Sequence, residues 1–218
     1  MRIRLTFSKT GALRYTGHLD LHTIWERTIR RAGLPLAYTQ GFHPGPKIQL
    51  ASALPLGFIG HCEIVDIWLD ETPPSGEDFN RHYTSIIQPA APPGLTVLSI
   101  DQVDEHSPAL QTQVVSAEYE VSLLDPLPAA EVEALPGKIA AVLTAASLPA
   151  ERRGKKYDLR PLIEGLELQP LDRSDIYRLR MLLAAREGAT GRPEAVLEAL
   201  GIPFESTRIE RSRILLKE

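Results

Sequence analysis

Residues 33–57 read GLPLAYTQGFHPGPKIQLASALPLG, and the N-terminal half of the chain is organised around this stretch. Its four glycines and four prolines exclude a helix or a regular central strand through residues 39–47, because proline lacks an amide proton and glycine favours turns. Gly33 and Pro35 also end the helix that the preceding residues predict. The sequence therefore predicts a shaped loop between a helix and a strand.

The side chains of this loop are of kinds that bind ligands. They comprise aromatic rings, hydrogen-bonding groups and a cation: Tyr38, Gln40, Phe42, His43 and Lys47. Glycine lets a ligand approach the backbone closely, and proline stiffens the chain so that little entropy is lost on docking. We interpret the loop as a working surface. The alternative is a proline-rich connection whose Tyr38 and Phe42 pack on the core.

Hydrophobic periodicity predicts the fold class. Residues 2–8 alternate, which predicts a strand with an apolar inner face and with Arg2 and Arg4 on a basic outer face. A helix beginning within residues 16–20, strands at 47–54 and 61–69, a helix at 77–87 and a strand at 95–100 complete the order β-α-β-β-α-β. In the ferredoxin-like fold that has this order, two helices cover one face of an antiparallel sheet.

The same order recurs after a polar boundary segment at residues 101–113. Strands are predicted at 118–124, 163–168, 176–184 and 206–216, with helices at 129–146 and 193–200. The predicted fold class is therefore α+β, built as two tandem ferredoxin-like halves at residues 1–105 and 114–218. The first half carries the basic Gly/Pro loop.

Composition places the chain among soluble globular proteins. Of its 218 residues 43% are hydrophobic and 24% are charged, and no apolar run approaches the length of a membrane span. The first residues lack the apolar core of a secretion signal, so we expect a cytoplasmic protein. The single cysteine, Cys62, excludes an internal disulfide and an iron–sulfur cluster held by this chain alone.

The net charge of −4 conceals strong segregation. Residues 1–60 hold eight Lys or Arg against two acids, a charge of +6, and residues 61–151 carry −13. Residues 152–218 return to +3, with Arg152, Arg153, Lys155, Lys156 and Arg160 in one short segment. Two basic groups on one chain indicate a polyanionic partner, although charge runs are also common on solvated surfaces.

Several motifs resemble one uncharacterised bacterial family. They are LRYTGHLDL at residues 13–21, RRAGLP at 30–35, YTQGFHP at 38–44, GKKYDLRPLI at 154–163 and RPEAVL at 192–197. They resemble the radical SAM-linked family, whose domain is often fused to the end of a radical SAM protein or encoded beside one. Many members have Asn-Pro where this chain has His43-Pro44, which counts against a catalytic role for His43.

The resemblance implies an accessory role. A radical SAM enzyme needs three cysteines for its cluster, so this chain is not that enzyme and is not expected to act as an enzyme alone or to carry a cofactor. It implies a radical SAM protein as partner. Because radical SAM proteins act on RNA among other substrates, we expect the chain to bind RNA, either tRNA or ribosomal RNA, or another polyanion for that partner.

Arginine and lysine can contact phosphates while aromatic rings stack on unpaired bases. The predicted nucleic-acid-binding residues are Lys9, Arg14, Tyr15, His18, Arg27, Arg30, Arg31, Tyr38, Gln40, Phe42, His43, Lys47, Lys155, Lys156 and Arg160. We expect those of the first third to gather beside the loop as one concave surface.

Two other functions are open from the sequence. His18 and His43 could act as acid and base in a small RNA-processing enzyme. His18 and His22, four residues apart at a helix start, could instead bind a metal with His43, His61 or Cys62 as a third ligand. The other possibility is a protein–protein adaptor that contacts no nucleic acid.

Overall fold

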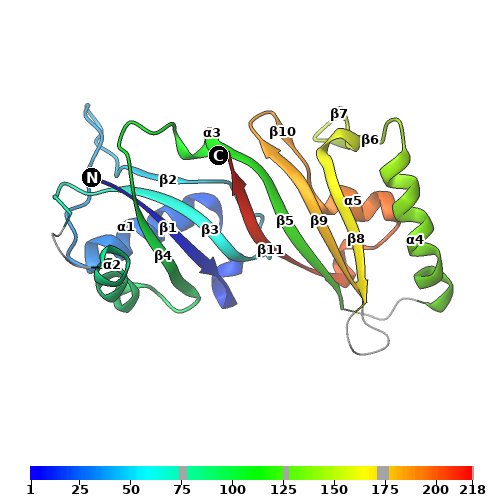
Figure 1. Cartoon of the computed structure of the whole chain (residues 1–218), viewed down its shortest axis with the longest axis horizontal. Coiled ribbons are helices and arrows are strands. Elements are labelled where there is room, and N and C mark those ends of the chain that lie inside the picture. The colour runs from blue at the N-terminus through cyan, green and yellow to red at the C-terminus, as the bar shows by residue number, and fades with distance from the viewer. Residues whose placement is uncertain (74–77, 125–127, 171–176, 218) are drawn as a thin grey trace. The chain divides into compact units, whose positions relative to one another are not determined.

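A computed structural model describes residues 1–73, 78–124, 128–170 and 177–217. It divides into two compact units, Met1–Val114 (unit 1) and Val115–Glu218 (unit 2) (Figure 1). The fold is mixed α+β, with a mostly antiparallel sheet and five α-helices in the described residues. None of the helices in these ranges is long and apolar enough to cross a membrane.

The described residues of unit 1 contain four strands and two principal helices. These are β1 (Arg2–Lys9), α1 (His18–Arg31), β2 (Ile48–Leu50), β3 (Ile59–Trp68), α2 (Phe79–Ile87) and β4 (Leu95–Val103). Shorter helices are η1 (Gly11–Tyr15), η2 (Gln88–Ala90) and α3 (Leu110–Gln113). The strands lie in the order β2-β3-β1-β4, and each neighbouring pair is antiparallel.

Both principal helices pack on the same face of this sheet. Ile3, Leu5 and Phe7 of β1 share one buried cluster with side chains of α1 and α2. Within it the rings of Phe7 and Trp25 meet edge to face, with centroids 4.9 Å apart. The inward face predicted for β1 is therefore confirmed.

The prediction that β1 has a basic face turned to solvent is wrong. Arg2 is 1% exposed and Asp66 of β3 is fully buried, and Arg2 Nε donates to Asp66 Oδ2 at 3.0 Å. Arg4 Nε donates to Asp66 Oδ1 at 2.8 Å. Arg2 also donates to the carbonyl oxygens of Ser107 and Pro108. The segment before α3 thus covers this face, and the two guanidinium groups are held by a buried carboxylate instead of facing solvent.

Unit 2 contains a larger set of strands. They are β5 (Val114–Leu123), β6 (Pro149–Arg152), β7 (Lys155–Asp158), β8 (Ile163–Pro170), β9 (Tyr177–Arg186), β10 (Ala189–Thr190) and β11 (Thr207–Leu216). The helices are α4 (Ala129–Thr144), α5 (Pro193–Leu200), η3 (Arg160–Leu162) and η4 (Phe204–Ser206). Strand β9 pairs with both β5 and β8, and β5 neighbours β11.

Most elements lie where the sequence predicts them. As the sequence predicts, helix α5 begins with Pro193, and Gly201 caps its C-terminus with a φ of 72°, which glycine adopts easily. Residue 77, where the second helix was expected to begin, and residue 176, the expected start of a strand, lie outside the described residues. The β6–β7 hairpin was not predicted.

Candidate anion-binding site

The β6–β7 hairpin supplies one wall of a basic cleft in unit 2. Its two-residue turn is Arg153-Gly154, with φ angles of 49° and 77°. Positive φ at both turn residues matches the right-handed twist of the paired strands. Arg152 lies opposite Lys155 in the register. Side chains directly opposite each other project to the same side of a hairpin, so these two cations share one face.

The second wall is the β9–β10 hairpin and the start of α5. Gly191 follows β10, and its amide donates to Ala184 O at 2.8 Å. A Cβ on Gly191 would lie 2.8 Å from the carbonyl oxygen of Leu162. Only glycine allows this close approach to Leu162, and its neighbours Thr190 and Arg192 line the same cleft as the first hairpin.

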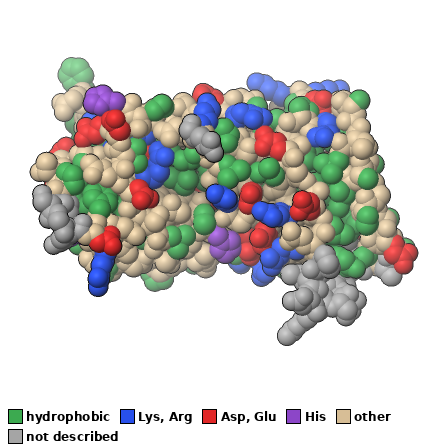
Figure 2. Space-filling model, viewed as in Figure 1, with side chains coloured by type: hydrophobic (Ala, Val, Ile, Leu, Met, Phe, Trp, Pro, Cys, Tyr) green, Lys and Arg blue, Asp and Glu red, His purple; other side chains and the backbone are tan. Residues whose placement is uncertain are grey.

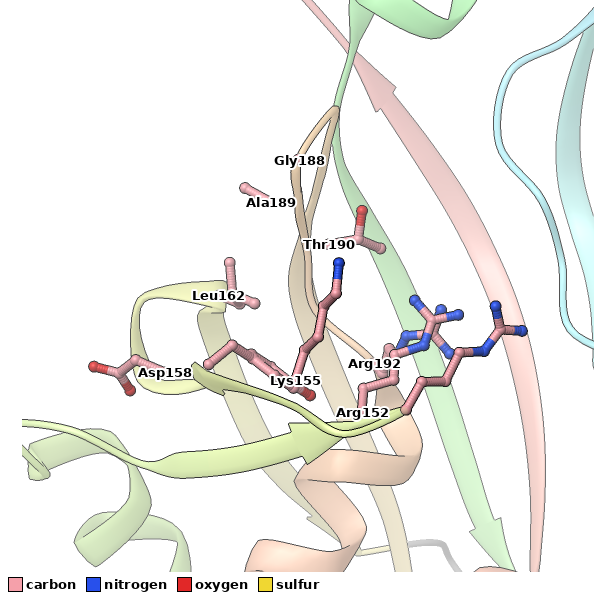
Figure 3. Close-up of a pocket in the computed structure, with 10 residues that line it drawn as sticks. Arg152, Lys155, Asp158, Leu162, Gly188, Ala189, Thr190 and Arg192 are labelled. Carbon is pink, nitrogen blue, oxygen red and sulfur yellow. The ribbon is translucent and has the colours of Figure 1, made fainter.

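The cleft has a volume of about 640 Å³ and opens to solvent. It is lined by Arg152, Arg153, Lys155, Tyr157, Asp158, Leu162, Gly188, Ala189, Thr190 and Arg192. Figure 3 shows the side chains of Arg152 and Arg192 on one side and the Lys155 side chain extended toward Thr190. The lining thus holds four cations and one carboxylate, and in Figure 2 Lys and Arg side chains gather where Figure 1 places β6, β7 and β10.

The one carboxylate is engaged by the backbone. Asp158 Oδ1 accepts hydrogen bonds from the amides of Leu148, at 2.8 Å, and Arg160, at 3.0 Å. These bonds lower the pKa of Asp158, because they stabilise its charged form. In Figure 3 its carboxylate points away from Arg152 and Arg192. The cleft therefore presents a strong positive field, which attracts anions.

Of the nucleic-acid-binding residues predicted in this region, Lys155 lines the cleft, as do Arg152 and Arg153 of the same basic segment. Lys156 lies opposite Glu151 on the other face of the hairpin, beside a second groove. Arg160 is half-buried, and its guanidinium donates to the carbonyl oxygens of Leu143 and Ile163. Arg160 is therefore a structural cation, and its backbone amide is the group that donates to Asp158.

The sequence did not indicate that Arg192 and Thr190 belong with this basic segment. The sequence placed Arg192 directly before a predicted helix, and that prediction is confirmed. The signal that could have found the second wall is Gly188, because glycine between two strand patterns marks a turn. Sequence alone gives no measure of the distance between that turn and Lys155.

Several predicted cations of the first third are held within unit 1. Lys9 is 1% exposed, and its Nζ donates to Thr16 O at 2.8 Å. Arg31 donates to Ala90 O at 2.6 Å, and Arg30 pairs with Glu26 one turn earlier in α1. The contacts of Lys9 and Arg31 tie segments of unit 1 together, whereas the Arg30–Glu26 pair lies on the exposed surface of α1.

Arg14 and Lys47 of that set lie near opposite ends of β3. Gly57 N donates to Arg14 O, and Lys9, whose Nζ contacts the chain just before α1, pairs with Gly60 of β3. At the other end of β3, Trp68 N donates to Lys47 O. Gly60 and Trp68 are eight residues apart in an extended strand, which spans roughly 26 Å. Lys9 and Arg14 therefore lie near one end of β3 and Lys47 near the other.

The same separation bears on the histidines. His18 begins α1 near the Gly60 end of β3, whereas His43 lies in the loop beyond Trp68. Side chains that far apart cannot share a substrate proton or a metal ion. Among the described residues, no group of three His, Cys, Asp or Glu side chains could hold a metal, so His22 and His61 gain no such partners.

The Gly/Pro loop combines both interpretations of its sequence. Tyr38 is half-buried and packs against the core of unit 1, whereas Phe42 is 102% exposed at the loop tip. Gln40 and His43 are exposed beside it, and Lys47 is exposed at the base. One aromatic residue anchors the loop and the other faces solvent.

A family model described as an uncharacterized protein conserved in bacteria (DUF2344) matches residues 2–193. The chain belongs to this family. Every residue lining the cleft of this DUF2344 chain lies within the matched range, as does the Gly/Pro loop. The motifs predicted an uncharacterised bacterial family, and that part of the prediction is confirmed. A comparison with curated proteins gives no match.

Proposed function

We propose that the chain is an RNA-binding accessory protein whose basic cleft in unit 2 binds backbone phosphates. The observation that carries this proposal is the grouping of Arg152, Arg153, Lys155 and Arg192 around a cleft whose one carboxylate is engaged elsewhere. Guanidinium groups bind phosphate oxygens through paired hydrogen bonds, and a lysine adds a compact charge. The hydroxyl of Thr190 lies at the same surface, where it donates to Arg186 O at 3.2 Å.

We further propose that the RNA is bound for a radical SAM partner, on the strength of the motif resemblance. A chain with one cysteine needs such a partner to take part in radical chemistry. Affinity purification from the source cells, followed by identification of the retained proteins, tests this. The expected protein carries a C-x-x-x-C-x-x-C motif, and its absence at low salt would count against the partnership.

We also infer that both units are ferredoxin-like. Support comes from the order of the long elements in each unit and from the position of the first strand. In unit 1, β1 lies between β3 and β4, and in unit 2, β5 lies between β9 and β11. On this inference the β6–β7 hairpin is an insertion between α4 and β8, and it carries most of the cations of the cleft.

Filter binding with total cellular RNA tests the RNA-binding proposal. We expect the wild type to retain RNA at low salt and Arg152→Glu/Arg192→Glu to bind at least tenfold more weakly. Lys156→Glu is the matched control, because it makes a charge reversal on the opposite face of the same hairpin. Thermal unfolding of each variant shows whether it is folded. A wild type that retains no RNA, or a double variant that binds like the wild type, would overturn the proposal.

A further inference from the structure

The Phe42 loop, residues 39–47, holds a fully exposed aromatic ring. Exposing a Phe side chain forgoes roughly 2 kcal/mol of burial free energy, so a tip of this kind needs an explanation. A hydrophobic side chain projects at the position of this loop in Figure 2. Its neighbours in the sequence, Gln40 and His43, are polar and exposed.

Backbone hydrogen bonds hold the neck of the loop. Thr39 N donates to Gly45 O at 2.8 Å, and Gly45 N donates in return to Thr39 Oγ1 at 3.0 Å. Lys47 N donates to Ala37 O at 2.8 Å. The neck is fixed in turn to the end of β3, because Trp68 contacts the backbone of both Ala37 and Lys47. The ring therefore lies on a loop whose base is fixed by hydrogen bonds, and this lowers the entropy lost when a ligand binds.

The surroundings of the ring fit a nucleobase better than a protein surface. A protein hot spot is an aromatic residue within a larger apolar patch that excludes water. Its neighbours in the sequence are an amide and an imidazole, and the cation Lys47 is exposed at the base of the same loop. A nucleobase needs only a flat face for stacking, hydrogen-bonding groups at its edge and a cation for the adjoining phosphate.

A hollow beside the neck provides room for an adjoining nucleotide. It has a volume of about 380 Å³ and is lined by Thr39, Pro46, Lys47, Ile48, Gln49 and Trp68. This volume lies within the range of small-molecule sites. Lys47 belongs both to the loop and to this hollow, so one cation could contact the phosphate that joins two nucleotides.

We propose that Phe42 stacks on an unpaired base, so that the RNA bound by this chain has a single-stranded segment. Paired bases in an RNA helix are stacked on their neighbours, and only an unpaired base offers a free face. The inference rests on the proposed function, since it names the kind of RNA. Gln40 hydrogen-bonds the edge of the base, and Lys47 contacts its phosphate.

The test compares one single-stranded RNA oligonucleotide with a blunt duplex of equal length. Phe42→Ala is expected to weaken binding of the single strand between about fivefold and 150-fold, the loss of one stacked base, and to leave duplex binding unchanged. Phe42→Trp is expected to bind at least as well as the wild type, and Phe42→Leu is expected to behave like Phe42→Ala. Leu56→Ala, which removes another exposed apolar side chain of unit 1, is the matched control.

The outcomes separate this inference from the proposed function. If Phe42→Ala binds the single strand like the wild type while Arg152→Glu/Arg192→Glu does not, base stacking is refuted and RNA binding stands. Equal binding by Phe42→Leu and Phe42→Trp would also refute it, because the ring would then be unnecessary. If the wild type binds neither RNA, both proposals fall.

Discussion

Neutralising two arginines of the cleft should change the salt dependence of RNA binding by a predictable amount. The lining holds four cations, and each can neutralise one phosphate. For a single strand, the logarithm of the affinity falls with the logarithm of salt by about 0.7 per phosphate, which gives a slope of about −2.8. Between 50 and 200 mM salt, the affinity through the cleft should then fall about 50-fold.

The variant Arg152→Gln/Arg192→Gln leaves two cations in the lining, so the slope should become about −1.4. The affinity should then fall only about sevenfold between 50 and 200 mM salt. Phosphate contacts elsewhere on the protein would add equally to both slopes, so the difference of about 1.4 is the quantity to test. Fluorescence anisotropy of a labelled single strand at five salt concentrations measures it. Lys156→Gln, on the other face of the hairpin, should keep the wild-type slope. Equal slopes for the double variant and the wild type would refute phosphate binding in the cleft.

Two stability predictions follow from unit 1, and urea or thermal unfolding measures both. Asp66→Ala removes the carboxylate that pairs with two guanidinium groups, and it should lower the free energy of unfolding by about 3–5 kcal/mol. Glu118→Ala, at a more exposed ion pair, should lower it by at most about 1 kcal/mol. Similar losses for the two variants would contradict the role given to the buried carboxylate. Gly94→Ala should destabilise more than Gly57→Ala. Both positions have positive φ, but only at Gly94 would a Cβ collide with backbone, 2.5 Å from Thr10 O. Equal melting temperatures would be evidence against that clash.

Local patterns predicted the elements of the fold well. The alternation in β1 and the Pro193 and Gly201 boundaries of α5 are consequences of steric and hydrogen-bonding rules that act over a few residues. The irregular path of residues 39–47 follows from the same rules. The β6–β7 hairpin was not recognised, because its strands have four residues each and their mostly polar side chains show no clear alternation.

The candidate site was harder to predict, because charge in a sequence does not reveal which partner a cation meets. Arg2 and Lys9 contributed to the basic count of the first third, yet both are buried and hydrogen-bonded. Conversely, Arg192 lies more than thirty residues from Lys155 and joins it only through the pairing of β9 with β8 and β10. Long-range pairing of this kind depends on the whole sheet.

The alternation of Lys155 and Lys156 across the β6–β7 hairpin makes the cleft sensitive to chain length. Inserting one residue into β7 between the turn and Lys155 would exchange the directions of the following side chains while leaving the amino-acid composition almost unchanged. Lys155 would then take the position of Lys156 and face the second groove, and Lys156 would take the position of Tyr157 on the cleft face. Relatives with altered hairpin lengths could thus keep the same total charge and still differ in which groove binds anions.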